Sequence, residues 1–494
     1  MNKNLNVGII GAGIQGISNA LFLQKKGFKV TIFDREKPGS PVASYGNAGH
    51  FSPYASLSLN RTDILMDVPA MLLSSTGPLA LKWNYVPKMI PWFLKFIFNT
   101  TKNKMMHTAK NMHQILDLAL PAYDELFEEI NLENLVENKG ILYVWNDKNL
   151  KSRELEIKVR EELGVKQQLV GKKDIHDLEP NLKKFYHAGV YYPYARHARN
   201  PKKILLKLFE LFLKKGGKFV NKNILNINFE GESPVLLSEN ESFGCDKIVI
   251  TCGAFSKKLT DKLDEKIPLD TERGYHVHFK DCDHLLSRPV IFHNRGFGIT
   301  PMEQGLRVVG TVEFGGLDNP ASKSRINNLI NNAKYMLGDL PEHEDEWLGF
   351  RPTLPDFLPV MGPSKNYKNV FLIDTYKSSS GLVYIDALFY DVSRIGFLSS
   401  LIDKFFSIVY VQSKIDYTHS FWPSFLLVVV LPETLAIGSV TVLYKNKKCD
   451  YAGIFSIITG LVSFLFLGVG YFIGPAFVTL AGVYRLYFSV FYNR

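Results

Sequence analysis

The hydrophobic pattern at the start of the chain predicts a strand, a glycine-rich turn, a helix and a second strand. Residues 6–10 form a short apolar run, and the sequence GAGIQG follows at 11–16. Apolar positions at helical spacing continue through Leu23, and a second apolar run covers residues 28–33. This order predicts a βαβ unit near the N-terminus.

The other end of the chain has long apolar runs that carry almost no charge. Residues 421–443 contain one charged residue, Glu433, and residues 451–484 contain none. Both runs are long enough to cross a bilayer, so we expect a helical, transmembrane C-terminal region over residues 383–494. A buried helix is the alternative for the first run, because two prolines and Glu433 weaken it.

Length and composition narrow the class of protein. A chain of 494 residues favours two or three structural units. The net charge of +10 comes mostly from scattered lysines, without a basic stripe between aromatic residues, so no nucleic-acid partner is expected. Four cysteines without a CxxC pair predict neither a disulfide framework nor a metal site.

The start of the chain gives an expectation about localisation. It runs directly into the first strand, without a charged segment, an apolar segment and a cleavage site. We therefore expect a membrane-associated protein whose catalytic part is cytoplasmic.

The glycines of the first turn each meet a requirement of dinucleotide binding. Gly11 makes the tight turn, Gly13 lets the backbone approach a pyrophosphate, and Gly16 lets the helix pack closely on the strand. The helix N-terminus favours the phosphate charge. Asp34 ends the second strand where a carboxylate accepts hydrogen bonds from an adenosine ribose. The unit predicts a dinucleotide and leaves NAD and FAD open.

Residues 43–51, ASYGNAGHF, resemble the second FAD segment of the D-amino-acid oxidase superfamily, especially its bacterial D-amino-acid dehydrogenase branch. Residues 347–362, WLGFRPTLPDFLPVMG, are the most specific match. Shorter similar segments are 77–83, 246–256, 271–276 and 300–313. The resemblance covers residues 5–373 and implies FAD rather than NAD as the cofactor. A surface loop is the alternative reading of residues 43–51.

The resemblance also implies a fold and its boundaries. We expect an α/β protein with a Rossmann-like FAD-binding domain and an α+β substrate domain that has a mixed sheet. The segments expected in the FAD-binding domain are 1–60, 170–265 and 345–382. Those expected in the substrate domain are 61–169 and 266–344.

Site residues follow from the same resemblance. Arg351 is expected to bind a substrate carboxylate through its planar guanidinium, with a structural ion pair as the alternative. Tyr275 and His276 are expected to line the pocket and His50 to lie near the flavin ring, with simple packing as the alternative. The residues expected to contact the cofactor, besides those named above, are Ser44, Gly46, Asn47, Ala48, Gly49, Gly253 and Gly381.

The implied reaction is oxidative deamination of a D-amino acid, or of a similar amine-bearing carboxylate, by hydride transfer to FAD. Dehydrogenase relatives pass electrons to a membrane quinone and oxidases use oxygen. The sequence leaves both acceptors open.

The resemblance weakens after Leu372. Family members continue with a glycine turn and a helix, whereas this chain reads IDTYKSSSGL at 373–382, where only Gly381 and Leu382 fit. This difference predicts weaker flavin binding or slower reduction, and a join to an unrelated membrane segment between Leu372 and Val383. The alternatives are a membrane protein with a non-catalytic flavoprotein remnant and an NAD(P)-dependent oxidoreductase. Residues 43–51 and 347–362 disfavour the latter.

Overall fold

The computed structural model describes residues 5–73, 77–132, 134–147 and 151–374. The chain separates into two units, residues 1–390 and 391–494, and only the first contains described residues. Gly381 and the predicted C-terminal apolar region lie outside them. Among the described helices, none combines the length and the apolar character that crossing a membrane requires.

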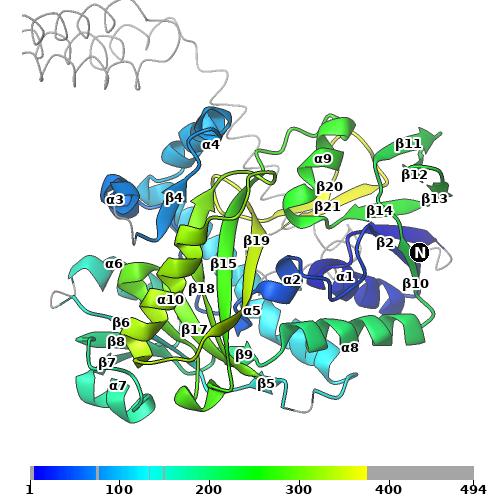
Figure 1. The fold of residues 1–494 in the computed structure, drawn as a ribbon. Helices are drawn as coiled ribbons and strands as arrows, with labels where there is room; N and C mark the ends of the chain where they lie inside the picture. The colour runs from blue at the N-terminus through cyan, green and yellow to red at the C-terminus, as the bar shows by residue number, and fades with distance from the viewer. Residues whose placement is uncertain (1–4, 74–76, 133, 148–150, 375–494) are drawn as a thin grey trace, which may run out of the picture. The chain divides into compact units, whose positions relative to one another are not determined.

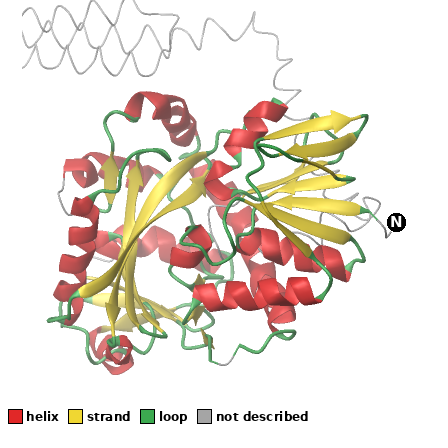
Figure 2. Ribbon diagram, turned by 45° about the vertical axis from the view of Figure 1, so that its right-hand side comes forward, coloured by secondary structure: helices red, strands yellow, loops and turns green. Residues whose placement is uncertain are grey.

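The predicted N-terminal βαβ unit lies at the centre of a six-stranded sheet (Figures 1 and 2). The strand order is β10-β2-β1-β14-β21-β20, and every neighbouring pair is parallel except β20 and β21. The strands are β1 (Asn6–Ile10), β2 (Lys29–Asp34), β10 (Lys218–Asn221), β14 (Lys247–Ile250), β20 (Val360–Pro363) and β21 (Val370–Asp374). Their apolar runs are typical of parallel strands that are covered on both faces.

Three helices share the core on one face of this sheet. They are α1 (Ile14–Lys25), α8 (Pro201–Lys214) and the C-terminal end of α5 (Lys102–Phe127), whose buried side chains join one cluster with β1 and β2. The first of them is the helix that the N-terminal pattern predicts. The end of α5 comes from a segment that we assigned to the substrate domain, and its aromatic residues Tyr123 and Phe127 pack on the nucleotide-binding side.

The second large sheet has nine strands and is mixed, as predicted. Its order is β19-β15-β18-β17-β16-β6-β8-β7, with β4 paired to β18. The pairs β6–β16 and β4–β18 are parallel, and the others are antiparallel. The strands are β4 (Leu79–Leu81), β6 (Ile141–Trp145), β7 (Gln168–Gly171), β8 (Ala188–Tyr192), β15 (Asp270–Lys280), β16 (Val290–Phe292), β17 (Phe297–Met302), β18 (Gly305–Phe314) and β19 (His343–Thr353).

This strand pairing differs from two of the predicted domain boundaries. We assigned residues 170–265 and 345–382 to the FAD-binding domain, but β8 pairs with β6, and β19 pairs with β15 over its whole length. Both strands therefore belong to the nine-stranded sheet. Local patterns show that a segment is a strand, and they do not show which distant strand it joins.

The remaining elements are two small sheets and a set of helices. One three-stranded sheet has the order β3 (His50–Phe51), β9 (Arg196–Ala198) and β5 (Val136–Glu137). The other has the order β11 (Asn226–Glu230), β12 (Ser233–Leu237) and β13 (Ser242–Gly244). The other helices are α2 (Ala43–Gly46), α3 (Thr62–Leu73), α4 (Val86–Phe98), α6 (Lys151–Glu162), α7 (Lys172–Leu178), α9 (Lys257–Thr260) and α10 (Lys323–Leu337). Helix α10 packs on β15 and β18 through an apolar cluster.

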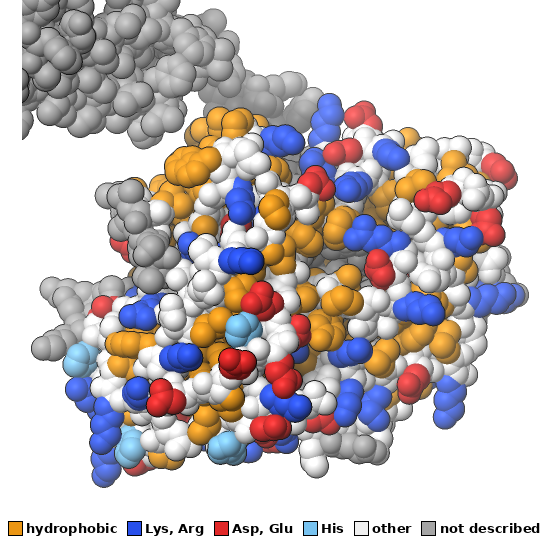
Figure 3. Space-filling view, in the orientation of Figure 1, with side chains coloured by type: hydrophobic (Ala, Val, Ile, Leu, Met, Phe, Trp, Pro, Cys, Tyr) orange, Lys and Arg blue, Asp and Glu red, His pale blue; other side chains and the backbone are white. Residues whose placement is uncertain are grey.

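Helix α4 exposes part of its apolar surface. Its inner side packs through Met89, Trp92 and Phe96, whereas Ile90 and Phe98 are largely exposed. Figure 3 shows apolar side chains gathered over this helix.

Candidate active site

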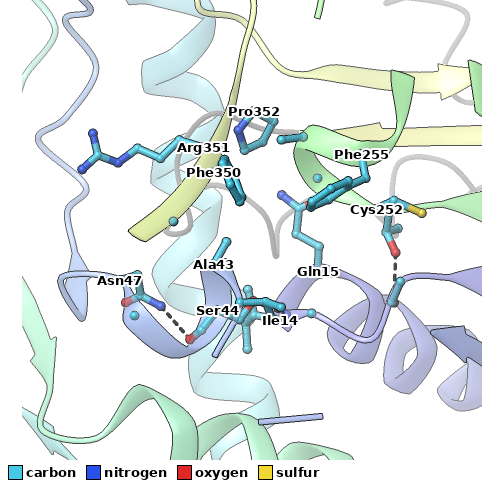
Figure 4. A pocket seen from close by; sticks show the side chains of 18 of the residues that line it. Ile14, Gln15, Ala43, Ser44, Asn47, Cys252, Phe255, Phe350, Arg351 and Pro352 are labelled. Atoms are coloured by element: carbon cyan, nitrogen blue, oxygen red, sulfur yellow. Dashed lines mark hydrogen bonds between the residues drawn. The ribbon is translucent and has the colours of Figure 1, made fainter. Parts of the chain in front are cut away.

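Residues of both large sheets line one cavity of about 1100 Å³. The turn between β1 and α1, helix α2, the turn after β14 and strand β19 all contribute to its wall (Figure 4). Pockets for small molecules usually have volumes of roughly 300–1,000 Å³. The cavity can therefore hold a ligand larger than a single small metabolite.

The glycine turn has the shape that a pyrophosphate site requires. Gly11 has a φ of +118°, and a Cβ atom there would lie 2.5 Å from the carbonyl oxygen of Thr251. A Cβ atom on Gly16 would lie 1.8 Å from the carbonyl oxygen of Gly11. At Gly13, which lines the cavity, the nearest atom to such a Cβ is Ser44 Oγ at 3.1 Å. The first and third glycines close the turn, and the second leaves its backbone open to a ligand.

Asp34 joins the glycine turn to the end of β2. One carboxylate oxygen accepts a hydrogen bond from the backbone N–H of Ala12 (2.6 Å), and the other accepts from Glu36 N–H (2.9 Å). Burial raises the pKa of this carboxyl group, against the effect of these hydrogen bonds. Each oxygen keeps a lone pair for a further donor, so Asp34 can also accept from a ribose hydroxyl.

The turn after β14 closes the same end of the cavity. Gly253 in this turn has a φ of +57°. The guanidinium of Arg35 stacks on the ring of Phe255, with 4.2 Å between Arg35 Cζ and the ring centroid. Thr251 Oγ1 lies 3.0 Å from the carbonyl oxygen of Ile10 and 3.2 Å from that of Gly11, so it links this turn to the glycine turn. These groups suit the adenosine half of a dinucleotide.

The second predicted cofactor segment forms α2 and the residues that follow it. Ser44 Oγ accepts the backbone N–H of Ile14 (3.0 Å) at the start of α1. Asn47 folds back on its own segment, because its Nδ2 donates to Ser44 O (2.9 Å) and its Oδ1 accepts from Gly49 N–H (2.7 Å). Gly46, Asn47 and Ala48 line the cavity, whereas Gly49 lies behind them with a φ of +71°.

Arg351 lies on β19 at the opposite end of the cavity from Phe255 (Figure 4). Its guanidinium packs against Gly274, where a Cβ atom would lie 2.3 Å from Nη2. Its only hydrogen bond within the described residues runs from Nη1 to the carbonyl oxygen of Thr311 and is long, at 3.4 Å. No carboxylate in the described part of the chain forms an ion pair with it, so the charge is available to a ligand.

A β-bulge lies directly beside this arginine. The register between β15 and β18 shifts between Arg273 and Tyr275. Thr311, on the opposite strand, has a φ of +62°, a conformation that β-branched residues rarely adopt. Such strain concentrates at functional sites, and here it turns the Thr311 carbonyl toward Arg351.

The three other predicted pocket residues lie in different surroundings. His50 lines the cavity, and its Nε2 lies 2.8 Å from Thr300 Oγ1. Burial lowers the pKa of His50 to about 4, so the ring is neutral at physiological pH. Tyr275 touches the cavity, but its hydroxyl donates to Glu313 (2.7 Å) in the core, and burial with this contact raises its pKa to about 12.

The structure corrects the expected position of His276. The ring is fully buried, stacks on Trp347 at 5.0 Å between centroids, and donates from Nδ1 to Gly46 O (2.9 Å). It therefore lies behind the cofactor segment and outside the pocket wall. His276 shares the face of the sheet that carries Arg351, and the segment that contains Gly46 covers its ring there.

Comparison with known sequences decides the family. The sequence model of the FAD dependent oxidoreductase family, DAO, matches residues 6–388. This chain belongs to that family. The match extends past residue 373, where we expected the resemblance to end, and includes Gly381. The predicted cofactor, FAD, is confirmed at the level of the family.

Relatives and solved structures agree with this assignment. The chain is 29% identical over 378 residues to a D-amino-acid oxidase of Bradyrhizobium diazoefficiens, covering 75% of this chain and 90% of the relative. It is 27% identical to a D-amino acid dehydrogenase of Vibrio vulnificus, covering 72% and 88%. Glycine oxidase from Geobacillus kaustophilus has the same fold, with a TM-score of 0.58 at 20% identity over 78% of this chain and 94% of that one.

An FAD-containing structure has this fold too. L-α-glycerophosphate oxidase from Mycoplasma pneumoniae with FAD bound matches with a TM-score of 0.57 at 16% identity, over 77% of this chain and 92% of that one. The DAO family member described here is therefore an FAD-dependent oxidoreductase, with amino-acid-oxidising relatives.

Sequence reasoning missed several residues that build the site. Gly274 makes room for the Arg351 guanidinium, and Trp347 packs its indole against Gly46. Arg307 donates hydrogen bonds to the cofactor segment. The sequence contained a signal for Arg307, since an arginine within the mostly apolar residues 305–314 indicates a side chain that forms polar contacts from a strand.

Proposed function

We propose that this chain catalyses the FAD-dependent oxidative deamination of a D-amino acid or a similar amine-bearing carboxylate. The observation that carries the proposal is the cavity-lining guanidinium of Arg351, which has no carboxylate partner among the described residues. When bound, FAD supplies the hydride acceptor. The remaining tasks belong to the side chains around the cavity.

Arg351 binds and orients the substrate. Its planar fork matches the two oxygens of a carboxylate, and charge-assisted bidentate hydrogen bonds fix direction as well as distance. Gly274 leaves the space in which the guanidinium lies, and the carbonyl of Thr311 faces one of its nitrogens. Holding the carboxylate in one place restricts the α-carbon to one approach, which is the main contribution of such a residue to the rate.

The reaction needs no strong base from the protein. The α-hydrogen leaves with its bonding electrons as hydride, while the lone pair of the neutral amine forms the new C=N bond. Water then hydrolyses the imine to a keto acid and ammonia. His50 suits this scheme, because its lowered pKa keeps this cavity-lining ring uncharged.

The names of the relatives support the D configuration and leave the electron acceptor to experiment. One relative is a D-amino-acid oxidase and another is a D-amino acid dehydrogenase. We extend the proposal to a membrane quinone as acceptor, with the protein membrane-associated and its catalytic part cytoplasmic. Comparing reoxidation by a soluble quinone with reoxidation by oxygen tests this extension.

A visible spectrum of the purified protein tests the proposed function. The chain is purified in detergent, mixed with FAD, freed of unbound cofactor and titrated anaerobically with D-alanine and with L-alanine. We expect a flavin spectrum that the D enantiomer bleaches and the L enantiomer does not. Bound flavin that no D-amino acid, glycine or imino acid reduces would contradict the proposal. Protein that takes up no flavin would support a non-catalytic remnant.

A further inference from the structure

Hydrogen bonds hold every carbonyl group of residues 45–49, the segment that contains the cofactor-lining residues. Arg307 Nη1 donates to Tyr45 O (3.2 Å) and to Asn47 O (2.9 Å). The other carbonyls accept from His276 Nδ1 at Gly46 (2.9 Å), from Thr300 Oγ1 at Ala48 (3.1 Å) and from the backbone N–H of Ala198 at Gly49 (2.7 Å). Rotating any peptide whose carbonyl belongs to this segment would therefore break a hydrogen bond.

Three of these donors come from one face of the nine-stranded sheet. Thr300 on β17 lies opposite Arg307 on β18, which lies opposite His278 on β15. His276 is two residues from His278 and so faces the same side. We call Thr300, Arg307 and His276 the carbonyl clamp.

The face that carries the clamp also carries the substrate arginine. Trp347 on β19 lies opposite His276 and stacks on it, and alternate residues along β19 lead from Trp347 through Gly349 to Arg351. A Cβ atom on Gly46 would lie 2.2 Å from the Trp347 indole, so the clamped segment rests directly on this strand. Paired strands are stiff, so the sheet fixes the distance between the segment and Arg351.

Clamping the carbonyls also fixes the opposite side of the same peptides. In a trans peptide the C=O and the N–H point in opposite directions. With the carbonyls of Gly46 and Asn47 directed at the sheet, the N–H groups of Asn47 and Ala48 point away from it. Both residues line the cavity, so these N–H groups are available to the cofactor.

We propose that Arg307 is a positioning residue of the FAD site, which with His276 and Thr300 directs the N–H groups of residues 47 and 48 toward the cofactor at a fixed distance from Arg351. Arg307 is buried; no carboxylate in the described part of the chain lies within ion-pair distance of it, and Asp345 is the acidic group whose charge acts on it. Burying a cation on two carbonyls costs folding free energy that an apolar side chain at this position would avoid. A role in holding the segment accounts for that cost.

FAD affinity is the first test, because it requires no catalytic activity. Replacing Arg307 with methionine leaves two partly buried carbonyls without a donor and releases the segment. We expect the dissociation constant for FAD, measured by quenching of flavin fluorescence, to rise about tenfold to a hundredfold. The visible bands of the flavin that remains bound should shift, and R307K should restore part of the affinity.

Arg325 provides a matched control. It is also buried and donates from Nη1 to a backbone carbonyl, that of Gly77 (2.8 Å), but it lies on α10. R325M should lower stability to a similar extent and leave the FAD dissociation constant and the spectrum unchanged. An equal loss of FAD affinity in R307M and R325M would overturn the proposal, and so would an unchanged affinity in R307M.

A near-isosteric variant covers the case in which R307M does not fold. T300V nearly keeps the volume and removes one donor of the clamp together with the hydroxyl that bonds His50 Nε2, and we expect FAD to bind a few times more weakly. If T300V and R307K both bind FAD as the unmodified protein does, the proposal is wrong.

The kinetic test rests on the proposed function. With FAD saturating, R307M should slow flavin reduction by a D-amino acid while leaving the KM within about twofold, because Arg351 still binds the carboxylate. A rise in KM as large as the fall in the reduction rate would contradict the separate roles of Arg307 in positioning FAD and of Arg351 in binding the carboxylate. If the unmodified protein oxidises no amino acid, the proposed function fails, and the FAD measurements still decide whether the clamp positions the cofactor.

Discussion

The two ends of the cavity differ in how far apart in the chain their residues lie. The adenosine end is made mostly by one continuous stretch, from Gly11 to Asp34, which folds as strand, turn, helix and strand. The substrate end joins α2 to strands β15, β17, β18 and β19, which lie far apart in the chain. Substitutions at the adenosine end should weaken FAD binding, whereas substitutions at the substrate end should weaken substrate binding and leave FAD bound.

The largest effect is expected at the glycine turn. A methyl group on Gly16 meets the carbonyl oxygen of Gly11 at 1.8 Å, and neither backbone atom can move without opening the turn. We expect G16A to weaken FAD binding roughly a hundredfold or more, measured as flavin absorbance per protein after gel filtration. Gly244 has open space around its α-carbon, so G244A is the control and should keep its flavin.

At the other end, replacing Arg351 should remove substrate binding and leave the cofactor bound. Losing one partner of a buried charge pair costs about 2–5 kcal/mol, so we expect R351M to lower kcat/KM by about two to three orders of magnitude. R351K should recover part of the loss, because an ammonium group attracts a carboxylate without the bidentate fit. A lost flavin spectrum in R351M would show that the two ends are not independent.

Gly274 offers a smaller change at the same end. A methyl group there would lie 2.3 Å from Arg351 Nη2, and the flexible guanidinium can move aside, so the fold should survive. We expect G274A to raise the KM for a D-amino acid about tenfold, with little change in FAD content. Steady-state kinetics with the flavin absorbance of the same sample provides the measurement. An unchanged KM would contradict the placement of the carboxylate beside Gly274.

The difference between the two ends also explains what the sequence could predict. The glycine turn, Asp34 and the strands beside them could be predicted, because each depends on residues within about one βαβ unit. The mixed sheet agrees with expectation, and Arg351, expected to bind a substrate carboxylate, lies in the cavity wall. Both expectations came from the family resemblance rather than from periodicity.

The rest depends on strand register, which no local pattern contains. The expected pocket position of His276 was wrong because the ring turns to Gly46, a partner 230 positions away in the chain. The clamp formed by Arg307 and Thr300 requires that β17 and β18 pair in one register. A shift of one residue would turn both side chains to the opposite face.

A smaller effect on stability is expected from two histidines in the cross-strand pair next to the cavity. Burial lowers the pKa of His50 to about 4 and that of His197 to about 3, below the ordinary value near 6.5 in the unfolded chain. As the pH falls, the histidines of the unfolded chain bind protons before those of the folded protein, which favours unfolding. The stability that the two neutral rings contribute is therefore fully present above pH 6.5 and is lost as the pH falls toward 4. The loss is about 1.4 kcal/mol per pH unit for each histidine.

Urea unfolding between pH 7.5 and pH 5 measures this loss. His197 is almost fully buried and its Nδ1 has no hydrogen-bond partner among the described residues, so H197N should reduce the pH dependence without removing a hydrogen bond to that atom. The same slope in H197N and in the unmodified protein would show that this histidine binds protons as readily in the folded state as in the unfolded chain, against the lowered pKa.

The measurement that tests the central claim most directly compares two substrates in two proteins. Anaerobic flavin reduction is followed with D-alanine and with D-alaninamide, which lacks the carboxylate, in the unmodified chain and in R351M. The account predicts that the unmodified chain strongly prefers D-alanine and that R351M loses this preference while still holding FAD. A preference for D-alanine that R351M keeps would contradict the assignment of Arg351 as the carboxylate-binding residue.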